Sequence, residues 1–291
     1  MVVDGLDRPT QFVPLDDGSF VVAQLAGAEG DGTGEVLLVR PDGEREVLLD
    51  GLDVPTGVAV TADAIWVAQA TSLDRAEWSG PGGPVGALRP VVSGLPNNDR
   101  SQGSLTVTPD GRVLFATTGT LVGGAPAPRS ATLWSVPVSD LQQEPTAVAV
   151  GAKNAYATAV DGGDLLVTEI GDARVPPPDL LVRFPVPSPT GGGAPVDLGW
   201  PSCRPVGPCP GVVEPIARFA PGSTPTGVVA DGDGVLVALF VEGRVVSVPA
   251  GGGEAATVAD GLRGPHSLVR SVDGAVLLSE HEAGRIVRLP G

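Results

Sequence analysis

Basic residues are scarce in this chain of 291 residues. Lys153 is its only lysine, and acidic residues outnumber basic ones so strongly that the formal net charge is −16. Proteins that bind nucleic acids need clustered Lys and Arg side chains against the phosphates. The composition therefore excludes a nucleic-acid partner.

Long apolar segments are also missing. No run approaches 18 consecutive apolar residues, so the sequence contains no transmembrane helix. The first residues, Met1 to Asp4, have neither the basic start nor the apolar core of a signal peptide. Either the protein is cytosolic, or a leader was removed and Met1 was added.

Cysteine is rare as well. Cys203 and Cys209 lie in one Pro-rich loop, where a local disulfide would suit an exported protein; two free thiols are the alternative. Two cysteines and the distant His266 and His281 do not make a zinc ligand set. With the disulfide, we expect an extracellular or periplasmic protein whose leader has been removed.

Glycine and proline, by contrast, are abundant, with 42 and 30 residues. They separate runs rich in Val, Leu and Ala at a regular interval, which indicates turns between strands. The repeated unit is clearest at 51–70, where Gly-Leu is followed by Pro, a short apolar strand, a turn and a second apolar strand. In chain order, copies begin at Gly5, Gly51, Gly94, Gly151, Gly222 and Gly261.

An aspartate marks the turn inside each copy. All of these aspartates except Asp63 are followed by Gly, which is a strong hairpin signal. Their spacing is 40 to 51 residues except for one interval of 72, and a four-stranded propeller blade needs about 40 to 50. The pattern predicts an all-β protein, a six-bladed β-propeller forming one domain over 1–291. The long interval predicts an irregular insertion at about 171–216, between blades four and five.

The two ends of the chain complement each other. The last copy supplies three strands, and residues 1–6 match residues 257–262, which form the outer strand of blade five. We therefore predict that the N-terminal strand completes the last blade and closes the ring, which removes a free sheet edge.

Polar residues precede the predicted inner strands. In a propeller these positions surround one mouth of the central channel, where they could bind a sugar, a cofactor or a metal. The alternative is that they only solvate the channel. The candidates for this ring are Gln11, Thr56, Asp99, Arg100, Gln102, Asn154, Thr226 and His266.

Three carboxylates gather in the fourth copy. Glu169, Asp172 and Asp179 surround the turn at Gly171, and hard cations such as calcium prefer several carboxylate and carbonyl oxygens. The alternative is that these acids are simply solvated.

Four short motifs in the same region resemble those of the glucose/sorbosone dehydrogenase family. They are Lys-Asn-Ala-Tyr-Ala at 153–157, Thr-Glu-Ile-Gly-Asp at 168–172, Pro-Pro-Pro-Asp-Leu-Leu at 176–181 and Leu-Gly-Trp-Pro-Ser-Cys at 198–203. Residues 95–119 resemble the family's blade-three segment. The resemblance implies a six-bladed propeller that uses pyrroloquinoline quinone (PQQ) and calcium to oxidise sugars or related aldehydes.

The resemblance also implies roles for single residues. Asp99 matches an Asp that precedes the family's catalytic His, but Arg100 stands at the position of that His and cannot accept a proton. His266 would face the same mouth and is our candidate for a substitute base.

The other matched positions concern the cofactor, the metal and the substrate. Lys153 and Asn154 match a cofactor-binding pair, with Arg263 near other cofactor positions, while Val241 occupies the place of a quinone-contacting Lys. The implied calcium ligands are Gly171, Asp172 and Asp179. Trp200, in the Gly-Trp-Pro motif, is expected at the substrate mouth.

Three functional hypotheses follow. The first is an exported PQQ-dependent sugar or aldehyde dehydrogenase. The second is a non-catalytic propeller that binds a glycan, a polymer or a protein at the channel mouth. The third, a lactonase-like metal-dependent hydrolase, ranks last because no Glu precedes an inner strand.

Overall fold

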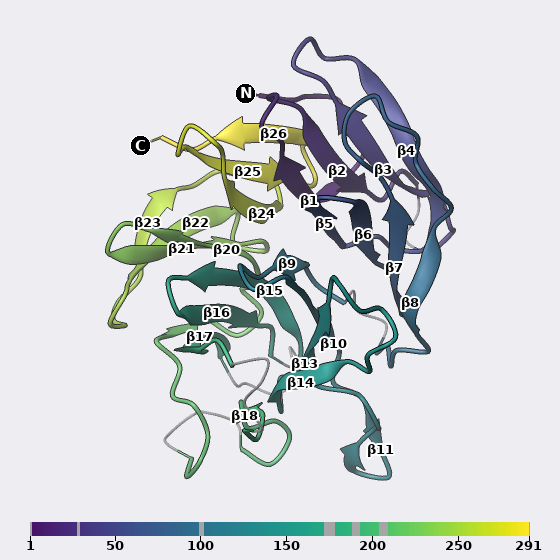
Figure 1. The fold of residues 1–291 in the computed structure, drawn as a ribbon. Helices are drawn as coiled ribbons and strands as arrows, with labels where there is room; N and C mark the ends of the chain where they lie inside the picture. Colours follow the sequence, from purple (N-terminus) through teal and green to yellow (C-terminus); the bar gives the residue numbers. More distant parts are fainter. Residues whose placement is uncertain are drawn as a thin grey trace.

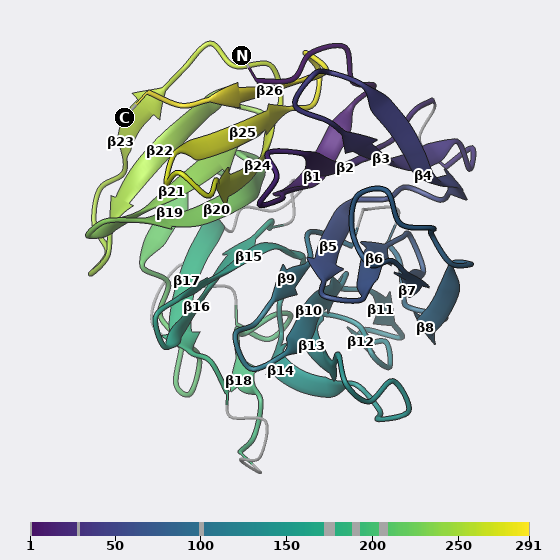
Figure 2. The same ribbon diagram turned by 45° about the horizontal axis from the view of Figure 1, so that its top comes forward.

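The fold is described from a computed structural model, which covers residues 2–27, 30–98, 102–171, 178–187, 193–203 and 209–290. Six sheets stand around a ring, as Figures 1 and 2 show. Within the described ranges there is no helix, and so none that could cross a membrane. The six-bladed β-propeller predicted from the repeats is confirmed.

The blades follow the chain order and are mostly antiparallel sheets of four strands. Blade one contains β1 (Pro9–Pro14), β2 (Phe20–Gln24), β3 (Gly34–Val39) and β4 (Arg45–Leu52). Blade two contains β5 (Gly57–Thr61), β6 (Ala64–Ala68), β7 (Ser72–Glu77) and β8 (Arg89–Ser93). Blade three contains β9 (Thr106–Val107), β10 (Arg112–Thr117), β13 (Thr132–Pro137) and β14 (Thr146–Val150). A separate hairpin, β11 (Leu121–Val122) and β12 (Ala125–Pro126), extends from blade three.

The second half repeats this plan. Blade four contains β15 (Ala155–Asp161), β16 (Asp164–Glu169), β17 (Asp179–Pro185) and β19 (Ala217–Phe219). Blade five contains β20 (Pro225–Asp231), β21 (Gly234–Leu239), β22 (Arg244–Pro249) and β23 (Ala256–Ala259). Blade six contains β24 (Pro265–Arg270), β25 (Val276–Glu280) and β26 (Arg285–Arg288).

The hydrophobic core is divided among the interfaces between blades. Because successive side chains of a strand point to opposite faces, each apolar strand serves two interfaces. In β2, Val21 and Ala23 pack toward blade two, whereas Phe20 and Val22 pack toward blade six. Similar clusters fill the other interfaces, so the ring is held together by apolar contacts between neighbours.

A hydroxyl group links each blade to the next near the channel. In every case a Thr or Ser side chain donates a hydrogen bond to a backbone carbonyl of the neighbouring blade. These bonds run from Thr10 to Pro55, Thr56 to Gly103, Thr106 to Thr158, Thr168 to Pro225, Thr226 to Pro265 and Ser279 to Thr10. Three of the six donors, Thr10, Thr56 and Thr226, belong to the Pro-Thr step of the repeat, which therefore helps to stabilise the ring.

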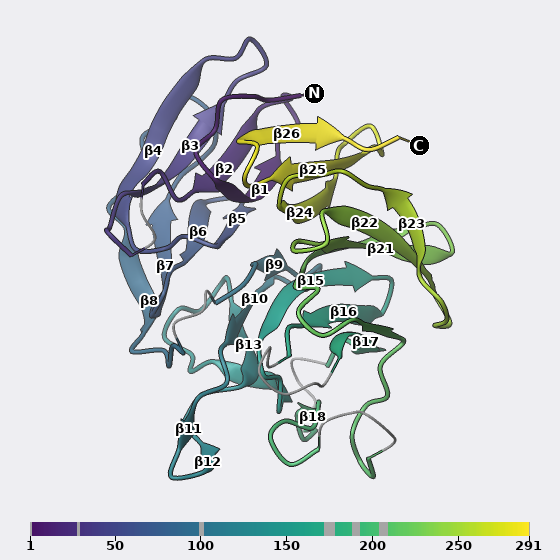
Figure 3. The same ribbon diagram turned by 180° about the vertical axis from the view of Figure 1, so that it is seen from behind.

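The N-terminal segment closes the ring on blade six (Figure 3). Val3 pairs with Ile286 of β26, and the amide of Leu6 donates to the carbonyl of Gly284 at 2.8 Å. The predicted closure is confirmed, although the pairing is an isolated bridge.

The insertion lies at a different place from the one predicted. Within 171–216, β17 is the third strand of blade four, and the fourth, β19, follows at Ala217. The extra residues therefore lie inside blade four, where their β18 (Val196–Asp197) adds a fifth, parallel strand to β14 of blade three. The spacing of the turns locates extra residues only to within one repeat, which explains the error.

Candidate binding pocket at the channel mouth

A pocket of about 440 Å³ opens at one mouth of the channel. Two positions of the repeat supply most of its wall. The first is the position of Thr in the Pro-Thr step, whichever residue occupies it. The second comes directly after the second strand of a blade. The first set contains Thr10, Thr56, Tyr156, Thr226 and His266, and the second contains Leu25, Ile170, Phe240 and His281.

Four rings form one side of the pocket. Tyr156 and Phe240 each meet His266 edge to face, with centroids 5.6 and 6.0 Å apart, and His266 stacks on His281 at 5.6 Å. The chain contains one tyrosine and two histidines, and all three lie here. The rarest polar aromatic residues of the sequence thus converge on one site.

The Tyr156 hydroxyl and Nε2 of His266 lie 2.9 Å apart in a buried hydrogen bond. Burial, and then the neighbouring His281, lower the pKa of His266 to about 3, and the Thr10 backbone offsets this only in part. The imidazole is therefore neutral at physiological pH. It can exchange hydrogen bonds, but as a base for a sugar hydroxyl it is far weaker than an ordinary histidine.

His281 was not among the residues predicted for the site. It is half-buried, and its Nδ1 lies 3.2 Å from the carbonyl oxygen of Pro9. Its position directly after β25 matches that of Phe240 after β21 and Ile170 after β16. That periodic position is the signal that could have identified it.

Four residues of the predicted polar ring make structural hydrogen bonds. Thr56 and Thr226 do line the pocket, but their hydroxyls donate to the next blade. The Gln11 amide joins blades one, two and three through Val58 and Leu105, and Gln102 bonds to the backbone of Ala70 and Thr118. These polar side chains on or beside the inner strands thus form hydrogen bonds with buried backbone groups.

Of the three predicted cofactor-binding residues, only Asn154 lines the pocket. The Lys153 ammonium donates to the Gly119 carbonyl at 2.9 Å and lies 5.0 Å from the centroid of the Trp200 ring, so Trp200 covers Lys153 rather than lining the pocket. Arg263 is exposed and lies outside the pocket wall. Asp99, Arg100 and Asp172 lie outside the described residues.

The predicted calcium ligand Asp179 is buried and bonded to backbone amides. Its carboxylate accepts from the amides of Gly171 at 2.8 Å and Thr224 at 2.7 Å. Burial raises its pKa, and those amides oppose the rise. Among the described residues, no cluster of three His, Cys, Asp or Glu side chains could hold a metal. The described residues around Asp179 do not fit a calcium ion.

Glu169 adds a second buried carboxyl beside Asp179. Its Oε1 accepts from the Lys153 amide at 2.7 Å, while its Oε2 has no hydrogen-bond partner in the described part of the chain. Burial raises the pKa of Glu169 to about 8, with a smaller upward effect from Asp179 and an opposing one from the Lys153 amide. The side chain is therefore mainly protonated at neutral pH.

The pocket is also a poor match for an anionic cofactor. No described residue of its wall is Lys or Arg, whereas PQQ carries three carboxylates. Burying unpaired negative charges against neutral walls is costly. On the described residues, PQQ does not fit.

Comparison with known proteins places the fold. No family model matches the sequence, and no curated protein matches it. Solved structures do match over almost the whole chain. The chain has the fold of sugar dehydrogenases.

Three of these structures illustrate the likeness. PQQ-bound aldose sugar dehydrogenase from Streptomyces coelicolor is 17% identical, with 99% of this chain and 95% of that chain covered and a TM-score of 0.78. A Thermus thermophilus oxidoreductase described as a glucose dehydrogenase is 17% identical, with 99% and 98% covered and a TM-score of 0.77. The calcium structure of a Trichoderma reesei enzyme of carbohydrate-active family AA12 is 14% identical, with 100% and 94% covered and a TM-score of 0.79.

Proposed function

We propose that this propeller binds a neutral small molecule, a sugar or a related aldehyde, in the mouth pocket. The observation that carries the proposal is the composition of the pocket wall. Its described residues include no Asp, Glu, Lys or Arg, and burial keeps His266 neutral at physiological pH. They combine aromatic rings with Asn154 and threonines. Rings that stack and neutral groups that exchange hydrogen bonds suit a polar but uncharged ligand.

The fold supports a sugar or an aldehyde as the class of ligand. The structures similar to this chain include sugar dehydrogenases, and the pocket occupies the channel mouth to which the sequence motifs point. A shared fold does not imply a shared activity. The choice between a neutral ligand and PQQ therefore rests on the side chains of the pocket. The absence of Lys and Arg from the described pocket wall supports recognition of a neutral ligand over retention of PQQ, and we therefore propose a binding propeller ahead of a quinone-dependent dehydrogenase.

We propose that the protein is exported to an extracellular or periplasmic compartment. Cys203 and Cys209 form a disulfide, as the sequence predicted, and disulfides persist mainly in oxidising compartments. An extracellular or periplasmic protein would meet free sugars and glycan fragments directly.

Calorimetric titration with neutral aldoses, aliphatic aldehydes and a matched sugar acid tests the proposal. We expect at least one neutral compound to bind, and the sugar acid to bind more weakly. Tyr156→Phe and Asn154→Ala should each weaken binding about tenfold or more. Absence of binding by every neutral compound would contradict the proposal.

The quinone is tested separately, with calcium present. We expect no saturable binding of PQQ at micromolar concentration and no dye reduction with aldoses. Val241→Lys places a cation on a pocket residue that is 67% exposed and should raise the affinity for PQQ. Stoichiometric binding of PQQ by the unmodified protein would restore the dehydrogenase hypothesis.

A further inference from the structure

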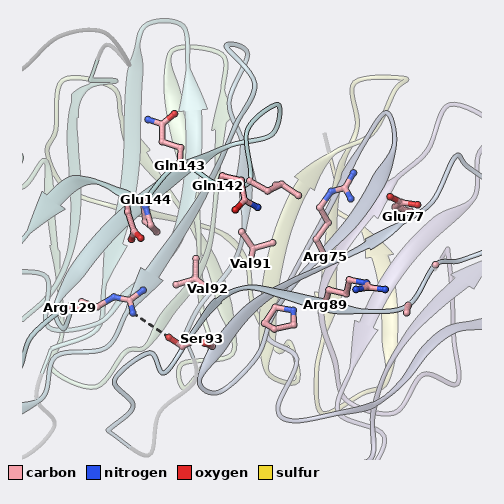
Figure 4. A pocket seen from close by; sticks show the side chains of 15 residues that line it. Arg75, Glu77, Arg89, Val91, Val92, Ser93, Arg129, Gln142, Gln143 and Glu144 are labelled. Atoms are coloured by element: carbon pink, nitrogen blue, oxygen red, sulfur yellow. Dashed lines mark hydrogen bonds between the residues drawn. The ribbon is translucent and has the colours of Figure 1, made fainter.

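A second concave site lies on the outer rim of the ring, between blades two and three. This rim groove has a volume of about 750 Å³ and shares no lining residue with the mouth pocket. One wall comes from β7, β8 and the segment before β8; the other comes from residues 141–145 and Arg129 of blade three. Figure 4 shows Val91 and Val92 between Arg89 on one side and Arg129 on the other.

Arginines distinguish this groove from the rest of an acidic surface. Most arginines in the described ranges form an ion pair with a carboxylate; Arg45, Arg89, Arg129 and Arg263 do not. Two of these four, Arg89 and Arg129, line the groove and are exposed. In a chain with a net charge of −16, cations without a carboxylate partner are available for an external anion.

The register of blade two strengthens this point. Arg75 and Arg89 are direct partners across β7 and β8, and like charges in that position are unfavourable. Arg75 is compensated by Asp63, which accepts at 2.6 Å, and by the Trp66 ring. Arg89 has no such partner among the described residues, so its charge faces the groove without compensation.

The backbone of the groove is a sheet edge that carries no further strand, although the Ser93 carbonyl of β8 already accepts a hydrogen bond from Nη1 of Arg129 at 3.3 Å. In the described part of blade two, β8 is the outermost strand, and no further strand pairs with it. Blade three shows what such an edge can accept, because β18 pairs with β14 in parallel there, with Val196 opposite Ala149 and Asp197 opposite Val150. An extended segment that contains an aspartate thus already completes the neighbouring blade.

We propose that the rim groove binds an extended acidic peptide of a partner protein, which adds as a fifth strand to β8. Its backbone pairs with the edge of β8, and its carboxylates contact Arg89 and Arg129. Glu77 and Glu144 also line the groove. They disfavour a uniformly polyanionic ligand and favour a peptide in which acidic residues alternate with uncharged ones.

Fluorescence anisotropy with labelled octapeptides tests this proposal on the full chain. The probes alternate Thr with Asp, with Asn or with Lys. We expect the Asp peptide to bind about tenfold more tightly than the Asn peptide, and the Lys peptide to bind least. The double variant Arg89→Glu, Arg129→Glu should reverse that order.

Two controls separate specific strand addition from general charge. Arg263→Glu makes the same charge change at an exposed site away from the groove and should leave the affinity within about twofold. An Asp peptide that is N-methylated at alternate residues cannot pair with β8 and should lose about tenfold. Equal binding of the methylated peptide, unchanged binding by the double variant, or no binding of the Asp peptide would each overturn the proposal. Thermal melting of the double variant verifies that it folds.

Discussion

The buried residue Glu169 should make the stability of the fold depend on pH. Its pKa rises from 4.5 to about 8 on folding, so the folded chain keeps a proton that the unfolded chain loses. Stability should therefore fall as the pH rises from 4.5 to 8, by about 1.4 kcal/mol per pH unit. Urea denaturation at pH 6.5 and at pH 8 measures this change in the free energy of unfolding. Both pH values lie above the range in which protonation of His266 affects stability. Glu169→Gln should remove the slope, and an unchanged slope in that variant would contradict the assignment.

His266 has the opposite effect at acid pH. Its pKa falls from 6.5 to about 3 on folding, so the unfolded chain binds the proton first as the pH drops. Stability due to this residue is complete above pH 6.5 and is lost between 6.5 and 3. Denaturation at pH 4 should show that His266→Gln is less sensitive to acid than the parent chain. Equal acid sensitivity of the two proteins would argue against a buried neutral imidazole.

In four blades the hydroxyl that joins one blade to the next lies on the first strand or directly before it, and in blades four and six it lies on the second strand. Thr226 is buried, and its hydroxyl donates to the Pro265 carbonyl at 2.9 Å. Thr226→Val keeps the shape but leaves that carbonyl without its partner, and should cost about 1 to 3 kcal/mol of unfolding free energy. Thr146→Val, at an exposed strand position, is the matched control and should change stability little. Equal stability of the two variants would mean that the link contributes nothing.

The same elements show how far the sequence could predict this fold. The Asp-Gly turns and the short apolar runs depend on local chemistry, and they predicted the six blades correctly. The insertion was assigned to the wrong place because β18 and β19 are short, and their partners, β14 and β17, are distant from them in the sequence. Long-range pairing of such short strands leaves little local signal.

At the scale of the whole molecule, closure depends on the N-terminus. Val3 is buried at the joint between blades six and one, whereas Val2 is 44% exposed. Deleting residues 1–5 removes this burial and the bridge to Ile286, and should lower Tm by roughly 5 °C. Val3→Ala should reproduce part of the loss and Val2→Ala should not. A deletion that melts like the full chain would contradict closure by this segment.

The side-chain contacts at the channel mouth were harder to predict than the ring, for a reason that applies to the whole architecture. Every repeat points the same positions toward the channel mouth, so the sequence could place His266, Asn154, Thr56 and Thr226 there, and all four line the pocket. The sequence could not reveal that hydroxyls and amides there are occupied by neighbouring blades, or that Lys153 turns toward Trp200. Those contacts depend on how six blades pack together.

The central claim is that a neutral aromatic pocket at the channel mouth binds the ligand. Nitrogen-detected NMR of the imidazole groups tests it most directly, because the chain has only two histidines and His266→Gln assigns both. We predict that His266 stays neutral from pH 8 to 4, and that adding a neutral aldose or aldehyde shifts the signals of both His266 and His281. Titration of His266 near pH 6.5, or signals that no neutral compound moves, would contradict the account.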